Sequence, residues 1–339
     1  MDSQFSHTLI ASFTSCILFV LVSLQGSNTA YLGQKNSLNF LVLADWGGQP
    51  NFPFYTTCEE YVAKQMGDLA SNYATQFVLA LGDNFYYDGV QNVTDPRFNE
   101  TFENVFTADS LQVPWYVVAG NHDWHGNVTA QILYSNMSKR WNFPSLYYLV
   151  RYQIPSTQEM VSFIMIDTVT LSGTTDDFNV LQQPTKPKDL FLVEKQFSWI
   201  EDQLKATMND TYVIVAGHYP VWSIAEHGPT ELLVDRLRPL LIKYNVNAYF
   251  SGHDHNLQHI REDNSSVEYF VIGSAHEVDP SVAHKKDVPA NWVKFHYADE
   301  SSLGGFAYME ATTSGMDFTF ADGRAGKSLY HATIKPRKM

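Results

Sequence analysis

Five short runs of apolar residues each end at a polar residue that can bind a metal ion. The runs cover residues 39–44, 77–81, 115–119, 212–216 and 246–250. Apolar runs of this length without alternation are typical of strands that are buried on both faces. We therefore predict five buried strands, and we expect the polar residues beyond them to converge at one edge of a sheet.

Apolar residues at helical spacing lie between these predicted strands. One set follows Thr56 and Thr57, which can cap a helix, and two more lie within residues 193–204 and 233–244. Pro239 lies inside the last set and predicts a kink there. The alternation of strands and helices indicates a layered α/β fold in which helices cover a sheet.

The two ends of this pattern suggest how the chain is organised. Residues 9–24 are mostly apolar and are followed by small and polar residues, so we predict a signal peptide at residues 1–30. A membrane anchor is the alternative, but the apolar run is short and interrupted. Residues 31–339 are predicted to form a single catalytic domain with an exposed loop at about residues 173–188, which lacks periodicity and is either functional or simply solvated.

Composition narrows the classes of partner. The chain has 339 residues, 45% of them apolar, and a formal net charge of −14. So acidic a protein lacks a broad basic surface for nucleic acid or anionic lipid, and we expect neither partner once the signal peptide is removed. We expect a monomer. An anionic substrate would need a local positive centre to bind against this background.

Six glycosylation sequons favour the secretory pathway, with lysosomal residence or secretion as the destination. We predict N-glycans at some of these asparagines, which are Asn92, Asn99, Asn127, Asn136, Asn209 and Asn264.

The polar residues beyond the apolar runs form a set with metal-binding chemistry. Carboxylate and phenolate oxygens suit a hard trivalent ion, whereas imidazole and amide groups suit a divalent transition metal. Each residue alone is weak evidence, because a lone histidine is more often a structural or surface group. Seven side chains in this order exceed the needs of one ion and suit two that share a carboxylate; they are Asp45, Asp83, Tyr86, Asn121, His218, His253 and His255.

The same residues carry a specific resemblance. The segments Asp45-Trp-Gly47, Gly82-Asp83-Asn-Phe-Tyr86, Gly120-Asn121-His122-Asp123, Gly217-His218 and Gly252-His253-Asp-His255 resemble those of the purple acid phosphatases, within the calcineurin-like metallophosphoesterases. Residues 215–230 and 251–258 look like the animal tartrate-resistant branch of that family. Tyr86 is the discriminating residue, because most relatives in the superfamily lack a tyrosine ligand at this position.

The resemblance implies a fold of two packed mixed β-sheets flanked by helices, an αββα sandwich. It also implies Fe(III) held by Asp45, Tyr86, His255 and a bridging Asp83. The second ion, Fe(II) with Zn(II) as the alternative, would be held by the same Asp83 and by Asn121, His218 and His253. The implied activity is that of an acid phosphatase in which a metal-bound hydroxide attacks phosphate monoesters, such as phosphoproteins, nucleotides and aryl phosphates.

The resemblance also extends beyond the metal ligands. His122 and His227 match the outer histidines of the family and are predicted to be catalytic, with structural hydrogen bonding as the alternative. Residues 173–188 resemble the family's repressive loop, which would place Asp176 or Asp177 across the mouth of the site. We expect the other histidines that were considered to have structural or surface roles; these are His125, His259, His276, His284 and His296.

Two other functions remain open at this point. One is a phosphodiesterase or nucleotidase on the same scaffold, which the tyrosine ligand argues against. The other is a catalytically silent, secreted metal-binding glycoprotein, which the complete set of seven ligands argues against.

Overall fold

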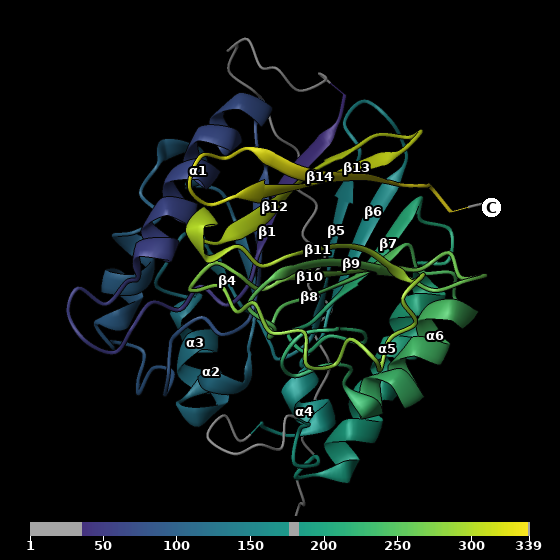
Figure 1. Ribbon diagram of the computed structural model, residues 1–339, viewed down its shortest axis with the longest axis horizontal. Coiled ribbons are helices and arrows are strands. Elements are labelled where there is room, and N and C mark those ends of the chain that lie inside the picture. The colour runs from purple at the N-terminus through teal and green to yellow at the C-terminus, as the bar shows by residue number, and fades with distance from the viewer. Residues whose placement is uncertain (1–35, 176–182, 338–339) are drawn as a thin grey trace, which may run out of the picture.

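The structure, a computed structural model, describes residues 36–175 and 183–337 (Figure 1). The predicted signal peptide at residues 1–30 therefore lies outside the described residues, and so do Asp176 and Asp177 of the predicted loop. No helix in the described part of the chain is long and apolar enough to cross a membrane.

The described strands form two seven-stranded sheets. In spatial order, the first sheet consists of β14 (Ser328–Ile334), β13 (Met316–Asp322), β12 (Gly305–Ala311), β1 (Leu38–Leu43), β2 (Phe77–Leu81), β3 (Trp115–Val118) and β4 (Trp141–Asn142). The second consists of β11 (Val293–Tyr297), β9 (Leu257–Arg261), β10 (Glu268–Ile272), β8 (Ala248–Ser251), β7 (Tyr212–Ala216), β6 (Met160–Met165) and β5 (Tyr148–Gln153).

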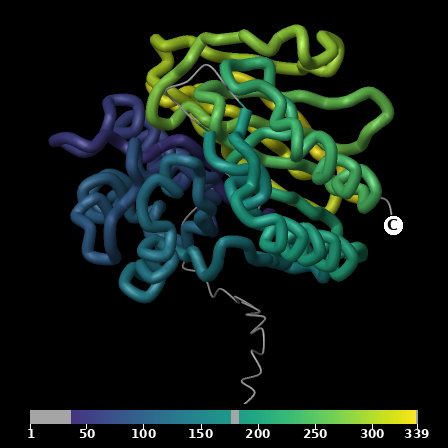
Figure 2. The backbone as a smooth tube through the Cα atoms, turned by 90° about the horizontal axis from the view of Figure 1, so that it is seen from below, coloured from purple at the N-terminus to yellow at the C-terminus, as the bar shows by residue number. Residues whose placement is uncertain are grey.

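Both sheets are mixed. Strands β1 to β4 are parallel, whereas β12 pairs with β1 in the antiparallel sense and so brings the C-terminal strands beside the N-terminal one (Figure 2). Strands β6, β7, β8 and β10 are parallel, and β5, β9 and β11 are antiparallel to their neighbours. The two mixed sheets flanked by helices confirm the predicted fold class.

The α-helices of the described residues are α1 (Thr57–Tyr73), α2 (Asn121–His125), α3 (Val128–Tyr134), α4 (Thr168–Ser172), α5 (Leu190–Ala206) and α6 (Arg238–Lys243). Helices form at the three predicted sites, as α1, α5 and α6 with the π-helical segment before it, whereas α2, α3 and α4 were not predicted. Thr56 caps α1 by accepting a hydrogen bond from the backbone N–H of Glu59 at 3.1 Å. Pro239 lies in the first turn of α6, directly after this π-helical segment, Leu233–Leu237, so the type of helix changes beside Pro239, and the kink itself stays a prediction.

Aromatic side chains fill the space between the two sheets. Phe77 of β2 stacks on Tyr152 of β5, with ring centroids 4.3 Å apart, and meets the edge of Phe163 of β6 at 5.4 Å. The outer face of the second sheet packs on helices: Val213 and Val215 of β7 share a cluster with residues of α5, whereas alternate residues of the same strand face the other sheet. Burial on both faces explains why these strands read as continuous apolar runs.

All five predicted strands exist, with ends that shift by at most two residues. The expectation that their polar residues would gather at one edge of a single sheet is wrong. The first three runs are β1, β2 and β3 of the first sheet, and the last two are β7 and β8 of the second. Hydrophobic periodicity predicts that a strand is buried, but it does not show which sheet the strand joins.

We expect Phe77→Ala to lower the free energy of unfolding by about 3–5 kcal/mol, because it removes a ring that both sheets contact and leaves a cavity between them. Urea unfolding followed by circular dichroism measures the change. Phe191→Ala is the control: Phe191 is 74% exposed, so its loss should shift stability by no more than about 0.5 kcal/mol. Equal effects of the two substitutions would contradict the assignment of Phe77 to the core.

Candidate metal centre

The seven predicted ligands come together where the strand ends of the two sheets meet. Asp45 follows β1, Asp83 and Tyr86 follow β2, and Asn121 begins α2 after β3. His218 follows β7 in the second sheet, and His253 and His255 follow β8.

One half of the centre is built around Tyr86. Its hydroxyl oxygen lies 2.9 Å from His255 Nε2 and 3.2 Å from Asp45 Oδ1. His255 Nε2 and Asp45 Oδ1 are themselves 3.6 Å apart. A phenol, an imidazole and a carboxylate thus present their donor atoms to one small volume.

The other half is built around His218. Its Nε2 lies 2.9 Å from Asn121 Oδ1 and 3.3 Å from Asp83 Oδ2. Donor atoms of His218, Asp83 and His253 all lie within 4.8 Å of one another. The two halves adjoin, since His218 Nε2 is 4.0 Å from Asp45 Oδ1.

The backbone at this site is unusual in ways that serve the close approach of the ligands. Asp45, Asp83 and His253 have left-handed backbones, with φ of 53°, 51° and 74°, a conformation that is uncommon outside glycine. Gly120 and Gly252 leave room for the carboxylates. A Cβ at Gly120 would lie 2.2 Å from Asp83 Oδ1, and one at Gly252 would lie 2.3 Å from Asp45 Oδ2.

Burial and neighbouring charges set the protonation of these groups. Burial, reinforced by the charges of Asp45 and Asp83, raises the pKa of Tyr86 well above its usual value, so the phenol keeps its proton unless a cation is present. Burial and the neighbouring histidines lower the pKa of His253 well below its usual value, which keeps this imidazole neutral. A neutral imidazole offers the lone pair that a metal needs.

The donor set fits two metal ions. His253 Nε2 is buried and has no hydrogen-bond partner among the described residues, which is costly for a polar atom unless something else binds there. The two halves also differ as the predicted ions do: the Tyr86 half has a phenol and the carboxylate of Asp45 with one imidazole, whereas the His218 half has an amide and two imidazoles.

The two predicted catalytic histidines contact ligands of different halves of the centre. His122 packs against Tyr86 with ring centroids 4.6 Å apart, and its Nδ1 lies 2.8 Å from the carbonyl oxygen of Tyr87. His227 stacks on His253 at 4.0 Å, and its backbone N–H donates to Asp254 Oδ1 at 2.8 Å. Both rings are therefore in contact with a predicted ligand, as an outer histidine would be.

Sequence reasoning missed several residues at this site. His276, which we expected to have a structural or surface role, is buried with its ring 4.4 Å from that of Tyr86. Glu277 contacts His255 Nδ1 at 3.0 Å. Arg97 donates to the carbonyl oxygens of Tyr86 and Gly47 at 2.8 and 2.5 Å. None of the three belongs to a motif, so no signal in a single sequence marks them.

The described part of the predicted loop reaches the segment that carries His227. Gln183 Nε2 donates to the carbonyl oxygen of Pro229 at 2.6 Å and to that of His227 at 3.3 Å. The backbone N–H of Thr185 donates to the carbonyl oxygen of Thr174 at 2.9 Å, which connects the described residues on either side of residues 176–182. The role predicted for Asp176 and Asp177 stays a prediction.

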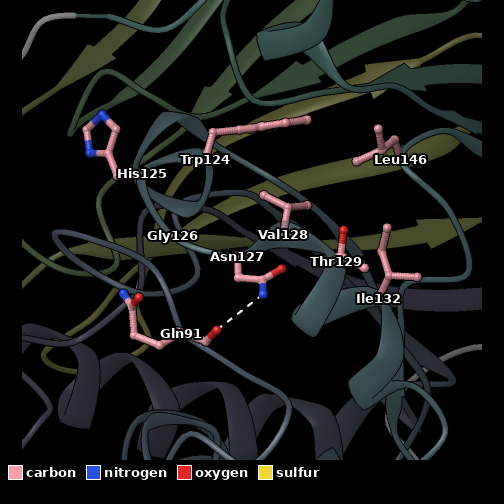
Figure 3. A pocket seen from close by; sticks show the side chains of 9 residues that line it. All are labelled: Gln91, Trp124, His125, Gly126, Asn127, Val128, Thr129, Ile132 and Leu146. Carbon is pink, nitrogen blue, oxygen red and sulfur yellow. Dashed lines mark hydrogen bonds between the residues drawn. The ribbon is translucent and has the colours of Figure 1, made fainter.

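A surface pocket of about 480 Å³ lies beside α2 and contains none of the seven predicted ligands (Figure 3). Trp124 and His125, which line it, follow the predicted catalytic His122 in α2. Asn127, one of the predicted glycan acceptors, also lines the pocket, and its Nδ2 donates to the carbonyl oxygen of Gln91 at 3.2 Å. A glycan at Asn127 would be attached to the same nitrogen, Nδ2, that makes this hydrogen bond.

Comparisons with known proteins show which proteins this chain is similar to. The family model of calcineurin-like phosphoesterases matches residues 38–257. The chain is 52% identical over 306 residues to the tartrate-resistant acid phosphatase type 5 of Oryctolagus cuniculus, covering 90% of this chain and 93% of the relative. It is 51% identical over 307 residues to the protein of the same name from Homo sapiens, with the same coverage. Among solved structures, GAP50, described as the anchor in the inner membrane complex of Plasmodium, superposes with a TM-score of 0.75 at 25% identity over 90% of each chain.

We expect the affinity of the metal-free protein for Zn(II) to rise with pH between pH 6 and about pH 9. Burial alone would lower the pKa of His218, but the carboxylates of Asp83 and Asp45 outweigh it and raise this pKa to about 9. Below that pH a metal must displace a proton from His218, which costs about tenfold in affinity per pH unit for each displaced proton. Competition with a chelator of known pH dependence measures this, and an affinity that is flat over the range would contradict it.

Proposed function

The chain belongs to the calcineurin-like phosphoesterase family and is an acid phosphatase, and we propose that it hydrolyses phosphate monoesters at a binuclear Fe(III)–Fe(II) centre held by the seven converging side chains. Zn(II) is the alternative for the second ion. The observation that carries this proposal is the placement of the Tyr86 hydroxyl beside Asp45 and His255, since a phenolate donor with carboxylate and imidazole suits Fe(III).

The proposed ligands divide into two sets that share a carboxylate. Asp45, Tyr86 and His255 would hold Fe(III), and Asn121, His218 and His253 would hold the second ion, with Asp83 between the two. When bound, the two ions would supply a net positive charge that attracts and polarises a phosphoryl group and lowers the pKa of water. In a chain with a formal charge of −14, this centre would be the local attraction that an anionic substrate needs.

We propose that His122 and His227 handle the proton of the leaving group. The carbonyl oxygen of Tyr87 can only accept, so His122 Nδ1 carries the hydrogen, and proton exchange at this ring takes place at Nε2. The contacts of His122 with Tyr86 and of His227 with His253 support this role, because each ring borders one half of the centre. A substrate phosphate bound between the halves would bring its ester oxygen near one of them.

One comparison favours a second candidate, a silent protein that keeps the fold without the chemistry. GAP50 shares the fold at a TM-score of 0.75, and its description is that of an anchor. The convergence of all seven proposed ligands in this chain favours catalysis instead, because a silent protein has no need to keep buried, unpartnered donors such as His253 Nε2.

We also propose that the protein travels the secretory pathway as a monomer and acts in lysosomes or outside the cell, with N-glycans on some of the six sequons. The apolar N-terminal segment and the sequons support this. The substrates would be phosphorylated small molecules or phosphoproteins.

We expect the oxidised protein to show a broad visible absorption band that is absent from Tyr86→Phe, because the band would arise from charge transfer between a tyrosinate and Fe(III). Iron and zinc content, measured on the same samples, should give about two metal ions per chain. Tyr87→Phe is the matched control, since Tyr87 is the neighbouring tyrosine and is 43% exposed; it should keep the band. A colourless protein with full metal occupancy that hydrolyses 4-nitrophenyl phosphate would instead indicate a Zn or Mn enzyme, and a metal-loaded but inactive protein would favour the silent candidate.

We expect loss of the proton donor to slow the hydrolysis of alkyl phosphates by about 10²–10⁴-fold and that of aryl phosphates much less, because a phenoxide leaves more readily without a proton. His122→Ala and His227→Ala should be compared on glycerol phosphate and 4-nitrophenyl phosphate. His331→Ala is the control, with an exposed ring on β14 that contacts Asp317. If one variant slows both substrates equally, that histidine is not the donor and has a structural role.

A further inference from the structure

In two of the proposed ligand histidines, the ring nitrogen Nδ1 contacts different kinds of hydrogen-bond acceptor. His218 Nδ1 lies 2.9 Å from the backbone carbonyl oxygen of Leu81, a neutral acceptor. His255 Nδ1 lies 3.0 Å from Glu277 Oε1, a charged one. In each ring the other nitrogen, Nε2, is the atom that faces the centre.

The contact with Glu277 fixes which nitrogen of His255 can bind a metal. An ionised carboxylate can only accept hydrogen bonds, so the hydrogen of the neutral imidazole must lie on Nδ1. The lone pair is then on Nε2, which points at the hydroxyl of Tyr86 and at Asp45 Oδ1. The hydrogen bond also holds the plane of the ring in the orientation that this approach needs.

Glu277 also makes the two halves of the centre unequal in charge. The Tyr86 half already has Asp45 and shares Asp83, and Glu277 adds a further negative charge one imidazole ring away. The corresponding position behind His218 is a neutral carbonyl of β2. Negative charge at this distance stabilises the more highly charged of two ions, and therefore favours a trivalent ion on the Tyr86 side.

We propose that Glu277 is a positioning residue that fixes the tautomer of His255 and biases the Tyr86 half of the centre toward a trivalent ion; this rests on the proposed function. An ordinary surface ion pair is the competing explanation, since the Glu277 side chain is 57% exposed. The His255 side chain is only 18% exposed and contacts Tyr86, however, so a change in its orientation is transmitted to the donor atoms of the centre.

The test compares Glu277→Ala with Glu277→Gln in the full chain. The alanine variant loses both the acceptor and the charge, and its affinity for Zn(II), measured by chelator competition, should fall about 10- to 100-fold. The glutamine amide oxygen can still accept from Nδ1, so this variant should recover most of that affinity. Both variants lose the charge, so in both the iron reduction potential should rise and the visible band should move to longer wavelength.

Asp287→Asn is the matched control. Asp287 Oδ2 contacts His284 Nδ1 at 2.7 Å and is 56% exposed, so it offers the same type of pair at a similar exposure, without a proposed metal ligand. Its substitution should leave Zn(II) affinity, potential and band unchanged. Glu277 variants that match the wild type in all three measurements overturn the inference. A wild type that lacks the visible band overturns the iron assignment instead, and the Zn(II) affinities still decide whether Glu277 positions His255.

Discussion

The burial of Asp45 and Asp83 between two sheets is the constraint on which the rest of this structure depends. Both carboxylates are completely or almost completely buried. Such groups are stable only when hydrogen bonds and opposite charges compensate for lost hydration. Asp45 Oδ2 accepts from the backbone N–H of His253, in the loop after β8 of the second sheet, at 2.8 Å. Asp83 Oδ1 accepts from the backbone of His122 at 3.0 Å, and its Oδ2 faces His218. The same two side chains therefore join the sheets and collect the metal-binding groups.

The close approach of these groups requires backbone conformations that the surrounding core must stabilise. The left-handed φ values of Asp45 and Asp83 are energetically unfavourable. They are maintained because the preceding strands are tightly packed on both faces. The aromatic layer around Phe77 sets the separation of the sheets, and that separation sets the distance between the ligands of β1 and β2 and those of β7 and β8. The packing of the core therefore determines the geometry of the site.

The sequence predicted the parts of this structure that depend on local pattern. The strands before Asp45, Asp83 and His218 were found because both of their faces are buried, and Thr56 was found because capping is a local interaction. The strands of the C-terminal region were missed; in β14 buried, half-buried and exposed residues follow one another without a run or a clear alternation. The division into two sheets came from the family resemblance alone. Glu277 could not have been predicted, because it lies 22 residues beyond His255 in a segment without regular structure, and only the fold brings them together.

Tyr86 is held in place by protein contacts that do not involve its hydroxyl. Its backbone N–H donates to the carbonyl oxygen of Gly47 at 3.0 Å, and the buried guanidinium of Arg97 donates to the carbonyl oxygens of both residues. The loops after β1 and β2 are therefore joined through their main chains, independently of the phenol. His276 and His122 then pack against the ring, which limits its rotation. These contacts restrict the side chain when the protein folds. The binding of an ion here would therefore lose little further conformational entropy. Replacement of the hydroxyl alone should consequently remove a donor while the arrangement of the remaining ligands persists.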